Sequence, residues 1–89
     1  MEQELRLKVE RYLKNAKTMF EELELTSPGK IDNKNIAKEF HQMAFSYYND
    51  AKHFYENNDY INALAALEYA EGWLDAGKLI GVFRKREPH

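Results

Sequence analysis

Apolar residues recur with a helical period in three segments of the chain. Between about residues 2 and 25 they follow one another at steps of three and four, which gathers them on one arc of a helix. The same period returns over about residues 33–57, where Phe40, Met43 and Tyr47 are among the residues expected on the core arc, and over about residues 60–83. No alternating apolar run flanks a hairpin dipeptide, so no strand is predicted. The pattern therefore predicts three helices and no sheet.

Two breaks of different length separate these segments. The first contains Pro28 and Gly29, which disfavour helical geometry and predict one long loop. The second is the short turn Asn57-Asn58-Asp59-Tyr60, in which Asp59 is a good helix N-cap. A connection this short requires antiparallel neighbours. We therefore expect an all-α, up-down-up three-helix bundle, with residues 1–89 forming a single domain.

Composition narrows the class of protein further. The chain has 89 residues, no cysteine and a net charge of −2. The length fits one domain, and the lack of cysteine excludes a disulfide framework, a thiolate metal site and a cysteine nucleophile. It also favours a reducing cytoplasm. The near-neutral charge gives no general attraction to nucleic acid or to an anionic membrane, and no apolar run has the length of a membrane span. A cytoplasmic protein is therefore expected.

The third helix carries two apolar stripes. One consists mainly of small residues: Ala63, Ala66, Leu67, Ala70, Leu74, Gly77 and Gly81. The other lies beside it: Ala65, Tyr69, Trp73, Ala76 and Ile80. Together they cover about 200° of the cylinder, more than the roughly 100° of a one-sided surface helix. This helix is therefore expected either to pack between the other two helices or to contact a partner, including a second copy of the chain.

Three glycines in this segment need a reason, because each costs roughly 1 kcal/mol relative to alanine inside a helix. Gly77 and Gly81 belong to the small-residue stripe, where they are expected to flatten one face for close helix approach. Gly72 points away from that stripe. It is interpreted as a partner contact or as a tolerated glycine.

The same region resembles a known family. The run Tyr69-Ala70-Glu71-Gly72-Trp73-Leu74-Asp75-Ala76-Gly77, followed by Gly81 and Phe83, is similar to the small archaeal helical proteins catalogued as domain of unknown function 357. The preceding Asn58-Asp59-Tyr60 turn also matches that family. The resemblance covers about residues 51–83 and implies a three-helix up-and-down bundle from an archaeal cytoplasm. It implies no activity, substrate or cofactor.

Candidate catalytic and metal-binding residues are few. Arg84 and His89 match the Arg-x4-His spacing of HEPN-type nucleases, but the histidine ends the chain and Pro88 prevents a regular helix there. His41 and His53 are twelve residues apart on one helix and cannot chelate an ion together. No metal site or cofactor is therefore expected.

Charged residues offer two further alternatives. Glu68, Glu71 and Asp75 form an acidic face on the third helix. We interpret it as a solvated face or as one that pairs with basic residues of the first helix. The alternative is that it binds a basic partner or a divalent cation. Those basic residues are scattered around the first helix and alternate with glutamates, which argues against a nucleic-acid stripe.

Partner binding is the function class that the pattern favours. Phe45 lies on the side of the second helix away from its apolar arc, with Tyr48 alongside, and exposed aromatic residues anchor interfaces. Tyr69 and Trp73 would add a second patch if the first helix leaves them uncovered. We expect a non-catalytic protein-interaction module, with self-association as one form of it and a nucleic-acid-associated or HEPN-like nuclease domain as the alternative. The candidate partner-binding residues are Phe45, Tyr48, Tyr69, Gly72, Trp73 and Ile80.

Overall fold

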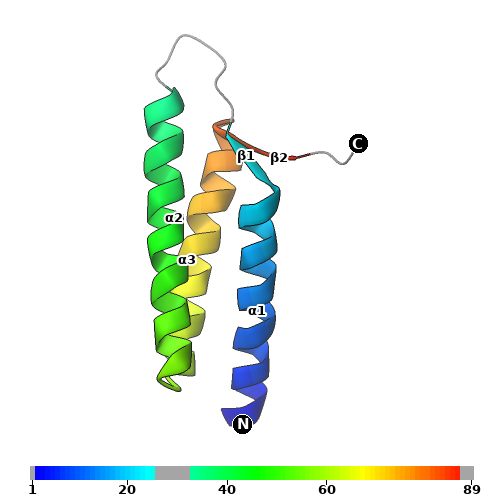
Figure 1. The fold of residues 1–89 in the computed structure, drawn as a ribbon, viewed down its shortest axis with the longest axis vertical. Coiled ribbons are helices and arrows are strands. Elements are labelled where there is room, and N and C mark those ends of the chain that lie inside the picture. The colour runs from blue at the N-terminus through cyan, green and yellow to red at the C-terminus, as the bar shows by residue number, and fades with distance from the viewer. Residues whose placement is uncertain (1, 26–32, 87–89) are drawn as a thin grey trace.

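The computed structural model describes residues 2–25 and 33–86 and contains three antiparallel helices. Helix α1 spans Glu2–Glu22, α2 spans Asn33–Glu56 and α3 spans Tyr60–Leu79. They run up, down and up (Figure 1). The predicted three-helix architecture is therefore confirmed. The predicted loop around Pro28 lies outside the described residues.

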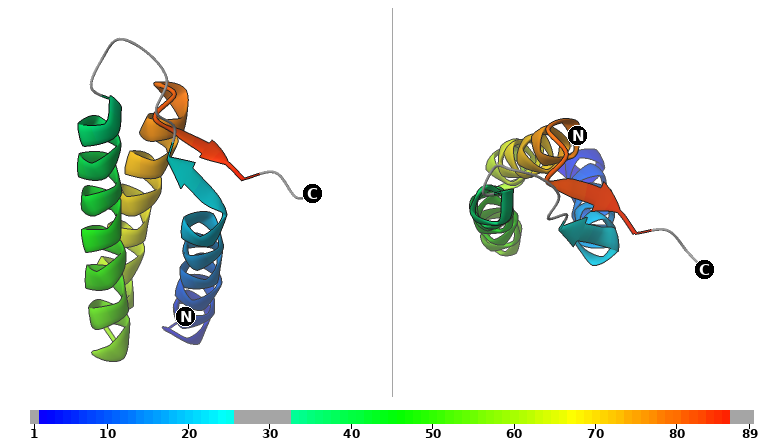
Figure 2. Two further views of the ribbon diagram at one scale, coloured as in Figure 1. Left: turned by 45° about the horizontal axis from the view of Figure 1, so that its top comes forward. Right: turned by 90° about the horizontal axis from the view of Figure 1, so that it is seen from above.

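Helix α3 is the central element of the bundle. Seen along the helix axes, α2 and α1 flank α3 on either side (Figure 2). Helix α1 packs mainly on α3 and makes a smaller contact with α2. The antiparallel pair α2 and α3 is thus the scaffold on which α1 rests.

Alanine and glycine line the seam between α2 and α3. The completely buried alanines of α2 are spaced by seven residues, and α3 repeats that spacing with three small buried residues. In an antiparallel pair a seven-residue repeat keeps one stripe facing the neighbouring helix over its whole length. The ring contacts Phe40–Trp73 and Tyr47–Tyr69 fix the register, which brings the two sets opposite each other. The seam residues are Ala37, Ala44 and Ala51 on α2, and Ala63, Ala70 and Gly77 on α3.

Two hydrophobic clusters fill the space between α1 and this scaffold. The cluster near the N-terminus of α1 contains Val9, Ala16 and Leu67, with half-buried aromatic residues around them. The cluster at the other end contains Leu74 and Phe83. Met43, which the sequence placed on the core arc of the second helix, is exposed instead. It is exposed because the alanine seam, and not the larger apolar residues beside it, forms the centre of that arc.

The predicted ends of the first and third helices are wrong, and so is the prediction that the chain forms no sheet. Each helix stops early, and the residues that follow form two short strands, β1 (Leu23–Leu25) and β2 (Phe83–Lys85). They pair antiparallel, with Leu23 opposite Lys85 and Leu25 opposite Phe83. Arg84 binds Glu24 at 3.3 Å on the exposed side of this pair. The pairing joins the end of α1 to the segment that follows α3 (Figure 1).

Gly81 ends α3 through its backbone conformation. Its φ of 85° is in the left-handed region that glycine adopts without strain. The Val82 N–H donates to the Gly77 carbonyl at 3.0 Å, and the Gly81 N–H donates to the Lys78 carbonyl at 3.2 Å. This hydrogen-bond pattern is a Schellman motif. Gly81 therefore reverses the chain. The expectation that it belongs to the small-residue stripe and flattens one face of the helix is wrong.

Gly77 does allow a close approach, but the large group that it accommodates comes from β2. A methyl group added at Gly77 would overlap the ring of Phe83, which supplies the three nearest heavy atoms. Phe83 is only 2% exposed. The helix end, the strand and the glycine thus form one packed unit.

Asp59 caps α3, as the sequence predicted. Its Oδ1 accepts the backbone N–H of Asn62 at 3.3 Å, and its Oδ2 accepts the Asn62 side-chain amide at 2.7 Å.

We expect Asp59→Ala to lower the free energy of unfolding by about 1 kcal/mol, because an N–H in the first turn of α3 loses its acceptor. Urea denaturation followed by circular dichroism measures this change. Asp59→Asn keeps an acceptor and should stay within a few tenths of a kcal/mol of the wild type. Equal stability of the alanine and asparagine variants would contradict the capping role.

Candidate interaction surface on helices α2 and α3

The α2–α3 pair has two flanks, and only one of them is covered. Because the seam is built from small residues, the larger side chains of both helices project to either side of it. Helix α1 covers one flank. No described helix or strand lies along the other flank (Figure 2). We call this second flank the open face, and its residues are Phe40, Met43 and Tyr47 from α2, and Tyr69, Gly72, Trp73, Ala76 and Ile80 from α3.

Aromatic pairs across the two helices organise the open face. The rings of Tyr47 and Tyr69 stack, with centroids 5.2 Å apart and an interplanar angle of 20°. Phe40 and Trp73 meet edge to face at 5.0 Å. Tyr69 is 62% exposed, and the other three rings of these pairs are half-buried. The rings are thus held in position by the scaffold while they present apolar area to the outside.

Gly72 opens a shallow depression in this face. The depression has a volume of about 320 Å³, and nearly all of its accessible lining surface belongs to apolar atoms. The residues that line it are Glu68, Tyr69, Gly72, Trp73 and Ala76. No heavy atom lies within 4 Å of a Cβ placed on Gly72. Contacts within the fold therefore do not require a glycine at this position. Whether a partner requires one stays a prediction.

The structure does not bring all six predicted partner-binding residues together. Tyr69, Gly72, Trp73 and Ile80 lie on the open face, and Ile80 is 54% exposed. Phe45 and Tyr48 lie on the opposite flank beside α1, where Phe45 is 38% exposed and Tyr48 is half-buried.

Phe45 and Tyr48 are partly used by the bundle itself. The ring of Phe20 from α1 lies 5.6 Å from Phe45 and 5.4 Å from Tyr48. Burial and the nearby carboxylate of Glu21 raise the pKa of Tyr48, and the ammonium of Lys52 lies 4.9 Å from the centre of its ring. These contacts explain Tyr48 as packing between α1 and α2, whereas Phe45 contacts Phe20 with one side of its ring and stays partly exposed.

The contribution of α2 to the open face does not follow from helical spacing alone. That spacing places Phe40, Met43 and Tyr47 on the core arc, because all three are apolar. The signal that could have separated them is the seven-residue repeat of Ala37, Ala44 and Ala51. That repeat marks the true centre of the buried stripe and places the three larger residues to one side of it.

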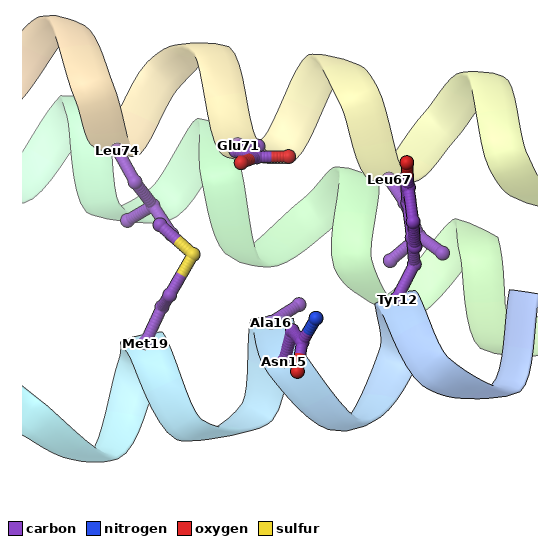
Figure 3. Close-up of a pocket in the computed structure, with 7 residues that line it drawn as sticks. All are labelled: Tyr12, Asn15, Ala16, Met19, Leu67, Glu71 and Leu74. Atoms are coloured by element: carbon purple, nitrogen blue, oxygen red, sulfur yellow. The ribbon is translucent and has the colours of Figure 1, made fainter. Parts of the chain in front are cut away.

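A second hollow lies between α1 and α3. Figure 3 shows Met19 pointing toward Leu74 and Tyr12 toward Leu67, with a space between Ala16 and Glu71. The hollow has a volume of about 230 Å³. The hollow is present because the small side chain of Ala16 leaves space opposite Glu71.

The predicted acidic face is divided by the structure. Glu71 lines the hollow between α1 and α3, whereas Glu68 lines the depression on the open face. Asp75 lies with Glu71 and Lys78 around a neighbouring hollow. Among the described residues, no ion pair joins these carboxylates to the basic residues of α1. Glu68 therefore belongs to a different surface from the other two.

Residues 2–25 and 33–86 contain no group of three histidine, aspartate or glutamate residues that could hold a metal ion. Tyr55 donates a hydrogen bond to the carboxylate of Glu10, which raises the pKa of Tyr55. Arg84 of the nuclease-like spacing binds Glu24, and His89 lies outside the described residues.

Comparison with known proteins places the chain in a family. A search of curated proteins and a search of solved structures gave no significant match. Within the described residues no helix has the length and apolar character needed to cross a bilayer. The model of a family described as "Protein of unknown function (DUF357)" matches residues 11–83, from the second half of α1 to the first residue of β2. Because this match covers the α2–α3 scaffold and most of the chain, the protein belongs to the DUF357 family.

Proposed function

We propose that this protein is a non-catalytic interaction module that binds a protein partner through the open face. The observation that carries the proposal is the row of aromatic pairs on α2 and α3, along which no other described helix or strand lies. Tyr69 and Trp73 are held by rings from α2, and they lie beside an apolar depression. Preorganised aromatic side chains of this kind are typical binding hot spots, because little conformational entropy is lost when a partner covers them.

The open face is a better candidate than the flank that contains Phe45. Phe45 and Tyr48 already contact Phe20, so a partner there would have to compete with α1. The open face requires no such rearrangement. We therefore assign partner binding to Tyr69, Gly72, Trp73 and Ile80 among the sequence candidates, and add Phe40, Met43 and Tyr47.

We propose that the module acts in the cytoplasm of an archaeon. A chain without cysteine suits a reducing compartment, and the family resemblance implies an archaeal source.

Photo-crosslinking in the producing cells tests the proposed function. The full-length protein would carry benzoylphenylalanine in place of Tyr69 or, as a matched control, in place of Leu7, which is 50% exposed on α1. We expect severalfold more crosslinked protein from position 69, because an interface buries its hot spots and leaves remote surface free. Gel electrophoresis and mass spectrometry measure the products. Equal crosslinking from both positions would contradict the proposal, and a product of twice the chain mass would identify a second copy as the partner.

A further inference from the structure

We propose that the open face binds an amphipathic helix whose apolar stripe is flanked by lysine or arginine residues. This inference rests on the proposed function and specifies the chemistry of its partner. Two features of the open face support it. One is the shape of the α2–α3 scaffold, and the other is the distribution of charge around that scaffold.

The shape of the scaffold favours a helix as the bound element. The alanine seam gives the α2–α3 pair two flanks of the same construction, each with a row of large side chains from both helices. A helix, α1, already lies along one flank (Figure 2). On the open face the side chains from Tyr69 to Ile80 extend over roughly 16 Å, which is about three helical turns. A helix of ordinary length can therefore cover this surface by side-chain packing alone.

Acidic residues border the open face. Glu39 precedes Met43 by four residues and Asp50 follows Tyr47 by three, so both lie on the outer edge of α2. Glu68 borders the depression from α3. All three side chains are exposed, and within the described residues none of them forms an ion pair. The apolar surface is thus bordered by uncompensated negative charge on both helices.

The lysine side chains that the structure describes on α2 and α3 lie on the other flank. Lys52 contacts the ring of Tyr48, which packs against Phe20 of α1. Lys78 lines a hollow together with Met19 and Leu23. Lys38 precedes His41 by three residues, and His41 also meets the Phe20 ring. No described lysine or arginine side chain of α2 or α3 therefore lies on the open face.

This charge distribution selects one class of partner. A helix with basic residues beside its apolar stripe would bring opposite charges together at both edges. A second copy docked through the same face would bring the acidic border of one copy (Glu39, Asp50 and Glu68) against the acidic border of the other, and like charges oppose such a contact. The acidic border therefore favours a basic partner over self-association.

Selection from a peptide library tests the inference on the full-length protein. The library would display amphipathic peptides of about four helical turns, with a fixed apolar stripe and random residues at the flanking positions. Selection is run in parallel against the wild type, against Tyr69→Lys and against Leu7→Lys, a control substitution on α1. Circular dichroism verifies that each variant is folded. We expect enrichment on the wild type and on Leu7→Lys, with lysine and arginine over-represented at the flanking positions.

A second measurement isolates the charge effect. Replacing Glu39, Asp50 and Glu68 together by lysine should weaken binding of a selected basic peptide about tenfold. A peptide with the same apolar stripe and neutral flanks should change little. Fluorescence anisotropy of labelled peptides gives both affinities.

Each alternative result has a distinct meaning. Enrichment of peptides with neutral or acidic flanks would overturn the inference of a basic partner and leave the proposed function intact. Selected peptides that gain no helicity on binding would overturn the helical partner. Equal enrichment on the wild type and on Tyr69→Lys would overturn the open face as a docking surface. Dimerisation through Tyr69 in a sedimentation series would replace the basic helix by a second copy.

Discussion

Replacing Phe83 by alanine is expected to lower the free energy of unfolding by about 3–5 kcal/mol. Phe83 is among the largest fully buried side chains, although it belongs to a strand of only three residues. Its ring packs on Gly77 within the cluster that also contains Leu23 and Leu74. Its removal would leave a cavity where β2, α3 and β1 meet. A loss of this size is a large part of the stability of a typical small domain.

Urea denaturation followed by circular dichroism measures the Phe83 effect. Arg84→Ala is the matched control, because it changes the neighbouring residue of the same strand and removes only an exposed ion pair with Glu24. That control should change the stability by less than about 1 kcal/mol. If Phe83→Ala were no more destabilising than Arg84→Ala, the strand pair would not belong to the core.

Adding one methyl group at Gly77 is expected to destabilise the protein by up to about 2 kcal/mol, although alanine is the better helix former. Alanine gains roughly 1 kcal/mol in helix propensity. Overlap with the buried ring of Phe83 forces a displacement, and such overpacking costs about 1–3 kcal/mol. The overlap is thus expected to exceed the gain.

Gly72→Ala provides the control for Gly77→Ala. It makes the same chemical change in the same helix, at a position where a methyl group meets no atom within 4 Å. It should raise the stability by up to about 1 kcal/mol. Opposite signs at the two glycines would show that packing, and not helix propensity, decides the outcome at Gly77. Equal effects would refute the steric role of Phe83.

A double-mutant cycle joins these two predictions. In the Phe83→Ala background the ring is gone, so Gly77→Ala should become neutral or stabilising. The coupling energy between the two positions is then expected to exceed about 1 kcal/mol, as found for residues in contact. Additive effects would mean that Gly77 is required for another reason.

Local periodicity was sufficient to predict the helices but not their ends. The apolar spacing around Val9, Ala44 and Leu67 identified all three helices, and Asp59 marked the start of the third. The ends of α1 and α3 depend on a pairing between Leu23–Leu25 and Phe83–Lys85, segments about sixty residues apart. Three-residue strands carry no periodic signal of their own. They form here because Gly81 reverses the chain and Phe83 reaches the core.

The candidate site was likewise predictable only in part from the sequence. The two stripes of α3, and with them Tyr69, Trp73 and Ile80, follow from the angular position of each residue around a helix axis, which sequence spacing fixes. Which stripe is covered depends on where another helix lies, and spacing within α3 contains no information about that. The register of α2 against α3 adds Tyr47 and Phe40 to the open face, and the position of α1 removes Phe45 and Tyr48 from it. The sequence by itself thus determined the faces of each helix, and only the tertiary structure decided which of them remained exposed, because burial depends on contacts between segments that are distant in the chain.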